Sequence, residues 1–516
     1  MLCGFLGACS GRNASPPDKA DSFIPTSTTN VVVANEPTDT ASPSLASGPL
    51  HTAAEDAEPL TYNEYSVTAD IDPETRMVTG IEKITYKNRA GIPLDRIYIN
   101  LYLNAFSGGA SYQPYFDSFA PRIFPEGARD YGYMVIGGIT ADNQTAEFTV
   151  SETVLAVSLP QSLAPEEIIE ITLHFEAYVP LINHRTGANE DAMWFGNFLP
   201  TLAVYDETGW HTEPYYPAGE PFYTRISNYT VKVTTPSSYS VVGTGEESFT
   251  EADGKRQTTM TAKMVRDFAF VICRNYKAQT VRTNSGIDIN VYTHSEIRDI
   301  NNLLVIALKS VDYYGELLGT YPYASLDIVE AGLFMKSGMA YPEIIFMDSE
   351  QLQSLDYSED LAHQIGHQWF YNTVGNNQIK EAWLGEGLTS MLQQGILYDD
   401  NQIRARMQRD YDTLQQTLRT AENKTLLQDL SVYKDWLSYQ NIHYTRAELM
   451  IYSLSQKMGP EAFRQFMKSY YTAFSFKTAT RKDFIAAAEA YGGDLTDFFR
   501  DWMENYELPP LVDTGP

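Results

Sequence analysis

The amino-acid sequence predicts an α+β protein, in which an N-terminal antiparallel β domain precedes a mixed α/β domain that ends in a helical lobe. Apolar and polar residues alternate with a period of two up to about residue 278, whereas apolar residues recur every three or four positions in the last part of the chain. Because 43% of the 516 residues are hydrophobic, the chain can build more than one hydrophobic core, which favours two or three structural units.

The first 59 residues are predicted to lie outside these domains. Residues 1–9 are interpreted as the remnant of a lipoprotein signal, because Leu6-Gly-Ala-Cys9 is similar to the lipobox after which bacterial lipoproteins are cleaved and lipidated. The alternative is an apolar stretch with a cysteine at a ragged terminus. Residues 10–59 are rich in Ser, Thr, Pro and Ala, which predicts a disordered linker. We therefore expect an extracytoplasmic protein of the bacterial cell surface, anchored to the membrane by a lipid on Cys9.

Residues 60–278 are predicted to form the β domain. The run Ile169–Phe175 alternates apolar with polar residues, as a strand with one buried face does, and Val67–Ile71 and Tyr229–Val233 repeat the pattern. Cys273 ends an apolar, strand-like run, which indicates a small buried core residue and not a reactive thiol. No run of the sequence reaches the ~18 uncharged apolar residues of a transmembrane helix.

Residues 279–510 are predicted to form the second domain. Three short β segments, 287–293, 326–330 and 343–347, come first, and helices follow. Two helices near the C-terminus have apolar faces at helical spacing. These faces are Phe463, Phe466, Met467 and Tyr470 in the first helix, and Phe484, Ala487, Ala488 and Tyr491 in the second. Gly459-Pro460 marks the start of the first helix and Gly492-Gly493 the end of the second.

The candidate metal ligands are His363, His367 and Glu386. Two residues four apart on a helix lie about 40° apart around its axis, so the two imidazoles can converge on one ion. Glu386 follows His367 by nineteen residues, on a predicted later helix, and would complete a His2Glu set with its fourth position open. The alternative is a helix with two half-buried histidines that bind nothing.

Three segments resemble one known family. Ala362–Leu388 is similar to the zinc-binding core of the M1 aminopeptidases, which are gluzincins, and Ser337–Phe346 resembles the substrate-binding strand of that family. His443–Glu448 falls where the family has its transition-state tyrosine. The resemblance extends from Tyr65 to about Trp502 and is to the bacterial members with a short C-terminus.

The resemblance implies a thermolysin-like second domain and one zinc ion per chain that activates water for aminopeptidase-type hydrolysis of peptides. The implied site residues are His363, His367 and Glu386 for the metal, Tyr444 for the oxyanion, and Gly338, Met339, Ala340 and Tyr439 for the substrate.

The sequence departs from the family pattern at three positions of the predicted site. Gln364 stands where His-Glu-x-x-His enzymes carry the glutamate that takes a proton from water, and an amide cannot accept that proton. General acid–base catalysis contributes typically ~10²–10⁴-fold, so Gln364 should raise the barrier by roughly 3–5 kcal/mol. Ala340 replaces the glutamate that binds the free amino group of the substrate, an interaction worth about 1.5–3 kcal/mol. Gly385 removes a polar neighbour of the metal-binding glutamate.

Two other carboxylates are candidates to replace the missing ones. Asp360 lies three residues before His363, where its simplest role is to stabilise the N-terminus of the helix and its alternative role is catalysis. Glu343 lies three residues after Ala340, which on an extended strand is the opposite face, so we do not expect it to substitute.

Three functions remain open on the sequence. The first is a zinc metallopeptidase with weak or altered activity, the second a catalytically silent pseudopeptidase that binds zinc and also peptides or protein partners, and the third a scaffold without metal. The net charge of −29 argues against nucleic acid as a partner. Peptides or proteins are therefore the expected ligands.

Overall fold

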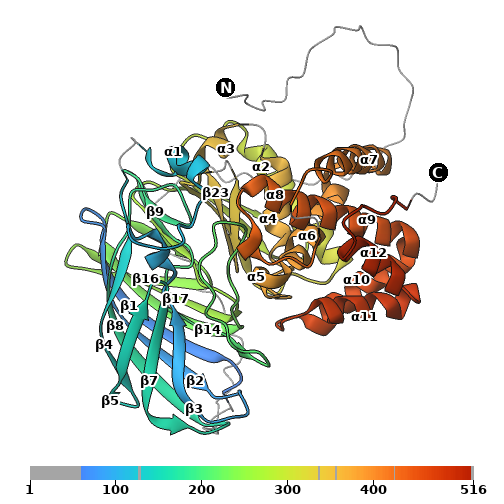
Figure 1. The fold of residues 1–516 in the computed structure, drawn as a ribbon. Helices are drawn as coiled ribbons and strands as arrows, with labels where there is room; N and C mark the ends of the chain where they lie inside the picture. Colours follow the sequence, from blue (N-terminus) through green and yellow to red (C-terminus); the bar gives the residue numbers. More distant parts are fainter. Residues whose placement is uncertain (1–59, 126–128, 335–336, 355–356, 423–424, 513–516) are drawn as a thin grey trace, which may run out of the picture. The chain divides into compact units, whose positions relative to one another are not determined.

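The computed structural model describes residues 60–125, 129–334, 337–354, 357–422 and 425–512 (Figure 1). The predicted lipoprotein signal, the predicted linker and Cys9 lie outside these ranges. Among the described residues, no helix combines the length and the apolar character that crossing a lipid bilayer requires.

An eight-stranded sheet begins the fold. In spatial order it contains β16 (Glu246–Ala252), β17 (Lys255–Val265), β14 (Ser227–Pro236), β1 (Asn63–Asp72), β2 (Met77–Lys87), β8 (Ile168–Tyr178), β4 (Tyr133–Ala141) and β5 (Gln144–Thr145). Buried and exposed residues alternate strictly along β1, as predicted for a strand with one buried face. The sheet is antiparallel as predicted except between β1 and β14, which are parallel. The long connection between these two strands leaves either direction open, so the sequence pattern does not specify it.

A four-stranded sheet shares a hydrophobic core with the first sheet. It consists of β11 (Thr201–Leu202), β3 (Leu94–Asn100), β7 (Val154–Leu163) and β6 (Glu147–Ser151). Ile97 of β3 and Val157 of β7 are fully buried in one cluster with Ile84 and Leu173 of the eight-stranded sheet. The β domain is therefore held by apolar side chains from both sheets.

A second four-stranded sheet joins the β domain to the rest of the chain. It consists of β15 (Ser240–Gly243), β18 (Phe270–Cys273), β10 (Ala192–Phe195) and β9 (Thr186–Ala188). Trp194 and Val271 of this sheet pack in one buried cluster with Ile344 and Phe346 of the next sheet. Cys273 is fully buried in the same cluster, and burial raises the pKa of its thiol to about 11, as expected for a core residue.

The next sheet has five strands and mixed directions. Its order is β19 (Lys277–Arg282), β20 (Asp288–Thr293), β21 (Ser325–Ala331), β23 (Ile344–Asp348) and β22 (Gly338–Tyr341). The three predicted β segments correspond to β20, β21 and β23. Strands β20, β21 and β23 are parallel, whereas β19 and β22 are antiparallel to their neighbours. Because β19 begins at Lys277, the predicted domain boundary at residue 278 falls inside this strand.

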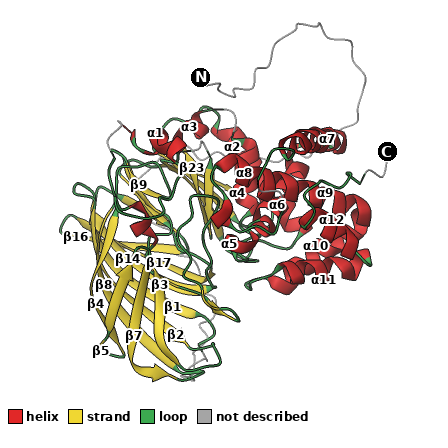
Figure 2. Cartoon of the chain, in the orientation of Figure 1, coloured by secondary structure: helices red, strands yellow, loops and turns green. Residues whose placement is uncertain are grey.

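Helices dominate the chain after β23, as Figure 2 shows. After the β domain the chain forms α2 (Ile300–Leu317), α4 (Ser358–Gly366), α5 (Gln378–Glu381), α6 (Trp383–Leu397), α7 (Asp400–Thr417), α8 (Trp436–Gln440) and α9 (Ala447–Met458). The shorter α1 (Ala120–Ile123) and α3 (Ser349–Gln353) precede α4, and the C-terminal helices are α10 (Pro460–Phe474), α11 (Arg481–Gly492) and α12 (Thr496–Met503). A hairpin of β12 (Tyr205–Asp206) and β13 (Gly209–Trp210) completes the list of strands.

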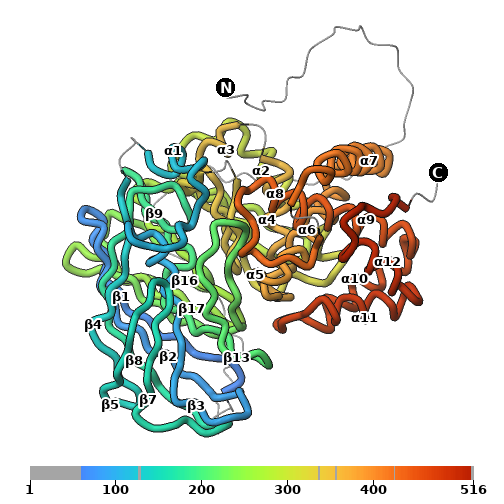
Figure 3. Tube along the Cα trace, viewed as in Figure 1, coloured from blue at the N-terminus to red at the C-terminus, as the bar shows by residue number. Residues whose placement is uncertain are grey.

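The C-terminal helices follow the predicted apolar spacing. Phe463, Phe466, Met467 and Tyr470 are all buried on α10, which starts with Gly459 at its N-cap and Pro460 in its first turn. On α11 the predicted face is buried at Phe484 and Ala488, but Tyr491 is exposed because the helix ends there. The order of the chain, from strands to helices along the trace in Figure 3, confirms the predicted α+β class.

Candidate metal centre

The two candidate histidines come from one helix end. Glu359 and Asp360 lie in the first turn of α4, where negative charge favours the helix dipole. The helix ends at Gly366, but His367 keeps helical backbone angles, so its side chain stays on the face of His363. The two Nε2 atoms lie 3.1 Å apart. The i, i+4 spacing thus brings both rings to one point, as predicted.

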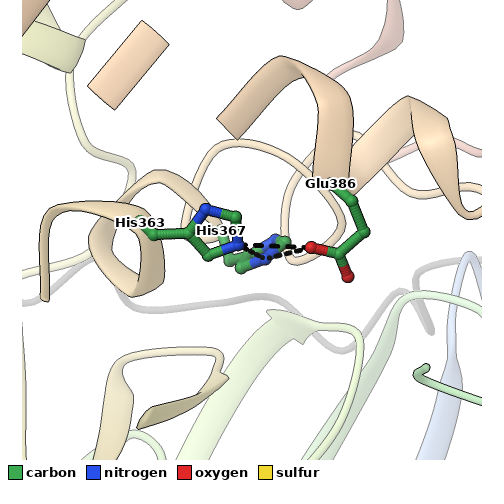
Figure 4. A group of neighbouring side chains, drawn as sticks. All are labelled: His363, His367 and Glu386. Carbon is green, nitrogen blue, oxygen red and sulfur yellow. Dashed lines mark hydrogen bonds and ion pairs between the residues drawn. The ribbon is translucent and has the colours of Figure 1, made fainter. Parts of the chain in front are cut away.

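Glu386 reaches the same point from α6. Its Oε2 lies 3.2 Å from Nε2 of His363 and 3.3 Å from Nε2 of His367. Figure 4 shows the carboxylate directed at the two rings. All three side chains are buried, and together they form a group that could hold a metal ion.

The spacing of these three atoms fits zinc. Ligand atoms at about 2.0–2.1 Å from a tetrahedral ion lie about 3.3 Å from one another. The observed separations of 3.1, 3.2 and 3.3 Å agree with that value. Two imidazole nitrogens and one carboxylate oxygen are also ligands that zinc accepts.

The charges of the group are strongly coupled. Burial alone would raise the pKa of Glu386, but the charge of His367 and hydrogen bonds with both histidines hold this pKa well below its usual range. Burial alone would lower the pKa of His367, and the charge of Glu386 raises it instead. An ionised carboxylate inside the protein requires a cation next to it. Protonated His367 provides this positive charge when no metal is bound, and a metal ion can provide it instead.

A second ring of contacts orients the histidines. Nδ1 of His363 lies 2.9 Å from Oε1 of Gln393, and Nδ1 of His367 lies 3.3 Å from the carbonyl oxygen of Phe370. Such partners fix the ring orientation and leave Nε2 to face the metal position. The sequence analysis did not identify Gln393, although it lies seven residues after Glu386 and therefore on the same face of α6.

Gln364 lines the cavity and contacts residues of two elements. Its Nε2 donates a hydrogen bond to Oδ1 of Asp360 at 3.3 Å. Gly338 of β22 packs against it so closely that a Cβ on Gly338 would lie 2.6 Å from Cγ of Gln364. Glycine at position 338 therefore allows the strand to lie directly against Gln364.

Asp360 is half-buried, and burial raises the pKa of its carboxyl group. It lines the same cavity as the ligands, while its Oδ2 has no hydrogen-bond partner among the described residues. Its place in the first turn of α4 agrees with the predicted role at the helix N-terminus, and its contact with Gln364 adds a link to the site.

The predicted substrate strand is β22, the last strand of its sheet. Gly338, Met339 and Ala340 all line the cavity. Strand β22 pairs with β23 on one side and with no strand on the other in the described sheet, so its backbone can pair with an extended peptide. The methyl group of Ala340 offers that peptide no charge.

The two predicted tyrosines differ in position. Tyr444 lines the cavity in a π-helical segment, Asn441–Arg446, and its ring stacks on that of His363 with centroids 5.6 Å apart. Tyr439 is fully buried and does not line the cavity. It packs against Gly219, whose positive φ and close approach leave no room for a Cβ. Tyr439 thus supports the loop of Gly219 and lies behind the cavity wall.

Two further expectations concern Glu343 and Gly385. Glu343 lies in the turn between β22 and β23, where it is buried and does not line the cavity. It is therefore remote from the site as expected, but because of the turn and not because of strand alternation. A Cβ on Gly385 would lie 3.8 Å from Oδ1 of Asn376 and from Cε1 of His367, so this position has room for a side chain.

The cavity has a volume of about 480 Å³ and is shared by both parts of the fold. The β domain contributes Arg185, Asn197, Glu220 and Asp267, among others. Arg185 forms an ion pair with Glu220, with NH2 of Arg185 2.5 Å from Oε1 of Glu220. Asn197 and Glu220 lie in segments that resemble the bacterial family members, but none of the four residues was predicted to line the site.

Comparison with known proteins agrees with this geometry. Residues 304–502 match the model of the peptidase family M1 domain. The chain is 27% identical over 218 residues to leukotriene A-4 hydrolase of Xenopus laevis, with 39% of this chain and 36% of that protein covered. It is 24% identical over 314 residues to human glutamyl aminopeptidase, with 56% and 32% covered. The chain thus spans about a third of the length of these curated relatives.

Solved structures match over most of the chain. The M1 zinc metallopeptidase of Deinococcus radiodurans has a TM-score of 0.62 at 17% identity, with 88% of this chain and 96% of that chain covered. A two-domain M1 zinc metallopeptidase variant bound to L-tryptophan has a TM-score of 0.65 at 16% identity, with 88% and 97% covered. The fold is therefore that of the two-domain M1 zinc metallopeptidases. Residues 304–502, which match the peptidase family M1 domain, include His363, His367 and Glu386, the group that could hold a metal ion.

Proposed function

We propose that this chain is a zinc peptidase of the M1 aminopeptidase type, with one zinc ion per chain and weak turnover. The observation that carries the proposal is the ligand group itself. Its three atoms are spaced for tetrahedral zinc, and the group lies in a cavity that also contains Tyr444 and the edge of β22. The match of residues 304–502 to the M1 domain supports the same chemistry.

The metal, when bound, would polarise the scissile carbonyl and acidify water. The residues of the chain would do the rest. Gln364 donates through its Nε2 to Asp360, which leaves its Oε1 to accept a hydrogen bond from water and hold that water in place. The phenol of Tyr444 would donate a hydrogen bond to the developing oxyanion. The free edge of β22 would align the peptide.

The weakness of turnover follows from two side chains. Gln364 cannot take the proton from water, and Ala340 cannot pair with the ammonium group of a substrate. The same two residues favour the second candidate function, a silent pseudopeptidase that binds zinc together with peptides or protein partners. The two functions differ in whether bound peptide is cleaved.

Hydrolysis of peptides tests the proposal. Full-length protein loaded with zinc would be incubated with a panel of tripeptides that carry free amino termini, and products would be measured by mass spectrometry. Slow cleavage that stops on chelation, and that is absent in His367→Ala, supports a peptidase. Binding of the same peptides without any cleavage would support the pseudopeptidase.

Location is a separate proposal that rests on the sequence alone. We propose that the protein is anchored outside the cytoplasm by a lipid on Cys9. Mass analysis of the N-terminus after fractionation of the source cells tests this, and an unmodified protein in the cytoplasmic fraction would contradict it.

A further inference from the structure

The cavity extends well beyond the metal ligands. Glu386, Ser390 and Gln394 lie at i, i+4 and i+8 on α6, and all three line it. Eight residues of helix rise about 12 Å, so the cavity reaches roughly that far from Glu386. Residues of α4 and its end also line the cavity, from His367 beside the ligands to Glu359, two turns earlier on the helix.

Four elements meet at this remote end. We refer to Glu359, Gln394, Arg406, Asp410 and Glu448 as the far subsite, and all five residues line the cavity. They come from α4, α6, α7, α7 and α9 respectively. Nη1 and Nη2 of Arg406 each lie 2.7 Å from one carboxylate oxygen of Glu359, so these two charges neutralise each other.

The three carboxyl groups of the far subsite share one cation, Arg406. Besides its pair with Glu359, Arg406 forms a long ion pair with Asp410, in which Nε lies 3.9 Å from Oδ2, too far for a hydrogen bond. Glu448 accepts a hydrogen bond of 2.8 Å from Nε2 of Gln394 and has no ion pair among the described residues. Burial, followed by the charge of Asp410, raises the pKa of Glu448 to about 8.

Gln394 gives independent evidence that a donor belongs here. Its side chain is 1% exposed, and its Nε2 donates to Glu448 and to the carbonyl oxygen of Ser390. Its Oε1 has no hydrogen-bond partner in the described part of the chain. A buried acceptor without a partner is unfavourable, so this oxygen is expected to meet a donor from a ligand.

We propose that the far subsite binds the cationic end of an arginine or lysine side chain of the peptide, from a residue next to the cleaved bond. The acceptor oxygens of Gln394, Asp410 and Glu448 match the donors of a guanidinium or ammonium group. This end of the cavity lies roughly 12 Å from the ligands, so only the longest side chains of a residue beside the cleaved bond can approach it. This inference deepens the proposed function and rests on it.

The test measures binding and not turnover. Titration calorimetry would measure the binding of pairs of tripeptides to the zinc-loaded, full-length protein. The two peptides of a pair differ only in having arginine or norleucine at one position. This position is the first residue in one series and the second residue in the other. In one series the arginine peptide should bind about 10-fold more tightly than the norleucine peptide, because a charged hydrogen bond increases affinity by about this factor. Equal affinities within both series, or no binding of either peptide, would overturn the proposal.

Variants and pH separate the subsite from general attraction to an acidic protein. Glu448→Gln, and independently Asp410→Asn, should remove most of the arginine preference. Glu504→Gln, at an exposed residue with the same change of charge, should keep it. In the wild type the ratio of the two affinities should rise between pH 6.5 and 9, because Glu448, which faces Asp410, Arg406 and Glu359, must lose its proton. A preference that survives both subsite variants would overturn the proposal.

Peptide binding and peptide cleavage are measured separately, so the far subsite and the peptidase activity are tested independently. Arginine preference without cleavage would leave the subsite in place and remove the peptidase. Cleavage without arginine preference would do the reverse.

Discussion

Gln364 donates its side-chain amide to Asp360, one helical turn earlier on α4, at 3.3 Å. This hydrogen bond orients the amide so that its nitrogen faces Asp360 and its oxygen is left for a donor in the cavity. It also connects Gln364 to a half-buried carboxyl group whose pKa is raised by burial. Under the proposed function, Gln364 would hold a water molecule through this oxygen but could not take its proton.

Gln364→Glu is expected to raise turnover. The new carboxylate can accept the proton, and such a base contributes typically ~10²–10⁴-fold to kcat. Because the introduced group would lie beside Asp360, repulsion between the two carboxylates should raise its pKa, so the gain should be larger at pH 8 than at pH 6. Steady-state kinetics of tripeptide hydrolysis by the zinc-loaded protein measure both effects.

Asp360→Asn is the matched control for this prediction. In the Gln364→Glu background it should reduce the pH dependence without abolishing the gain. If the wild type instead turns over rapidly, and Asp360→Asn alone abolishes that activity, then Asp360 is the base and our assignment of Gln364 as the limiting residue is wrong.

Ala340→Glu should act on substrate capture. The side chain at position 340 lines the cavity on β22 and is only half-buried, so a longer one can reach the ligand. Its carboxylate should lower KM about 10-fold for peptides with a free amino terminus. N-acetylated peptides of the same sequence serve as the control, and an equal change for both would show that the effect is not recognition of the amino group.

Tyr444→Phe should lower kcat and leave zinc content unchanged. The ring stacks on His363, and only the hydroxyl group is lost in this variant. Loss of one oxyanion donor typically costs ~10²–10³-fold in kcat. The effect is measured best in the Gln364→Glu background, where turnover is higher, and Tyr433→Phe serves as a control at a tyrosine outside the cavity lining.

Glu82→Gln should stabilise the protein at high pH. Glu82 is fully buried in β2, neither carboxylate oxygen has a partner among the residues that the structure describes, and burial raises its pKa well above the usual value. The folded state therefore keeps a proton that the unfolded state releases above about pH 4.5, which costs the wild type about 1.4 kcal/mol per pH unit until the folded pKa is reached. Thermal denaturation should show a gap in Tm between variant and wild type that widens from pH 5 to pH 8. A constant gap would contradict a buried, protonated Glu82.

Features with a local period could be predicted from the sequence. The pair of His363 and His367 depends only on helix geometry, and the strands and C-terminal helices follow from alternating or helical spacing of apolar residues. Glu386 required the additional inference of a second helix. These predictions succeed because one face of each element must be buried.

Features that depend on contacts between distant segments could not be predicted. Arg266 is fully buried and donates to the carbonyl oxygens of Tyr371, Thr224 and Lys477, so it ties the β domain to two parts of the catalytic domain. Nothing around Arg266 in the sequence distinguishes it from a surface arginine. The parallel pairing of β1 with β14 and the burial of Tyr439 behind the cavity wall likewise depend on tertiary packing.

Zinc content tests the central claim most directly. Full-length protein purified without chelator, and then dialysed against a small excess of zinc, should contain one zinc per chain by elemental analysis, because the three ligand atoms already have tetrahedral spacing. His367→Ala, which removes one ligand, should contain almost none while retaining the circular dichroism of the folded chain. Wild-type protein that takes up no zinc, or that binds as much zinc after His367→Ala as before, would contradict the assignment of this site.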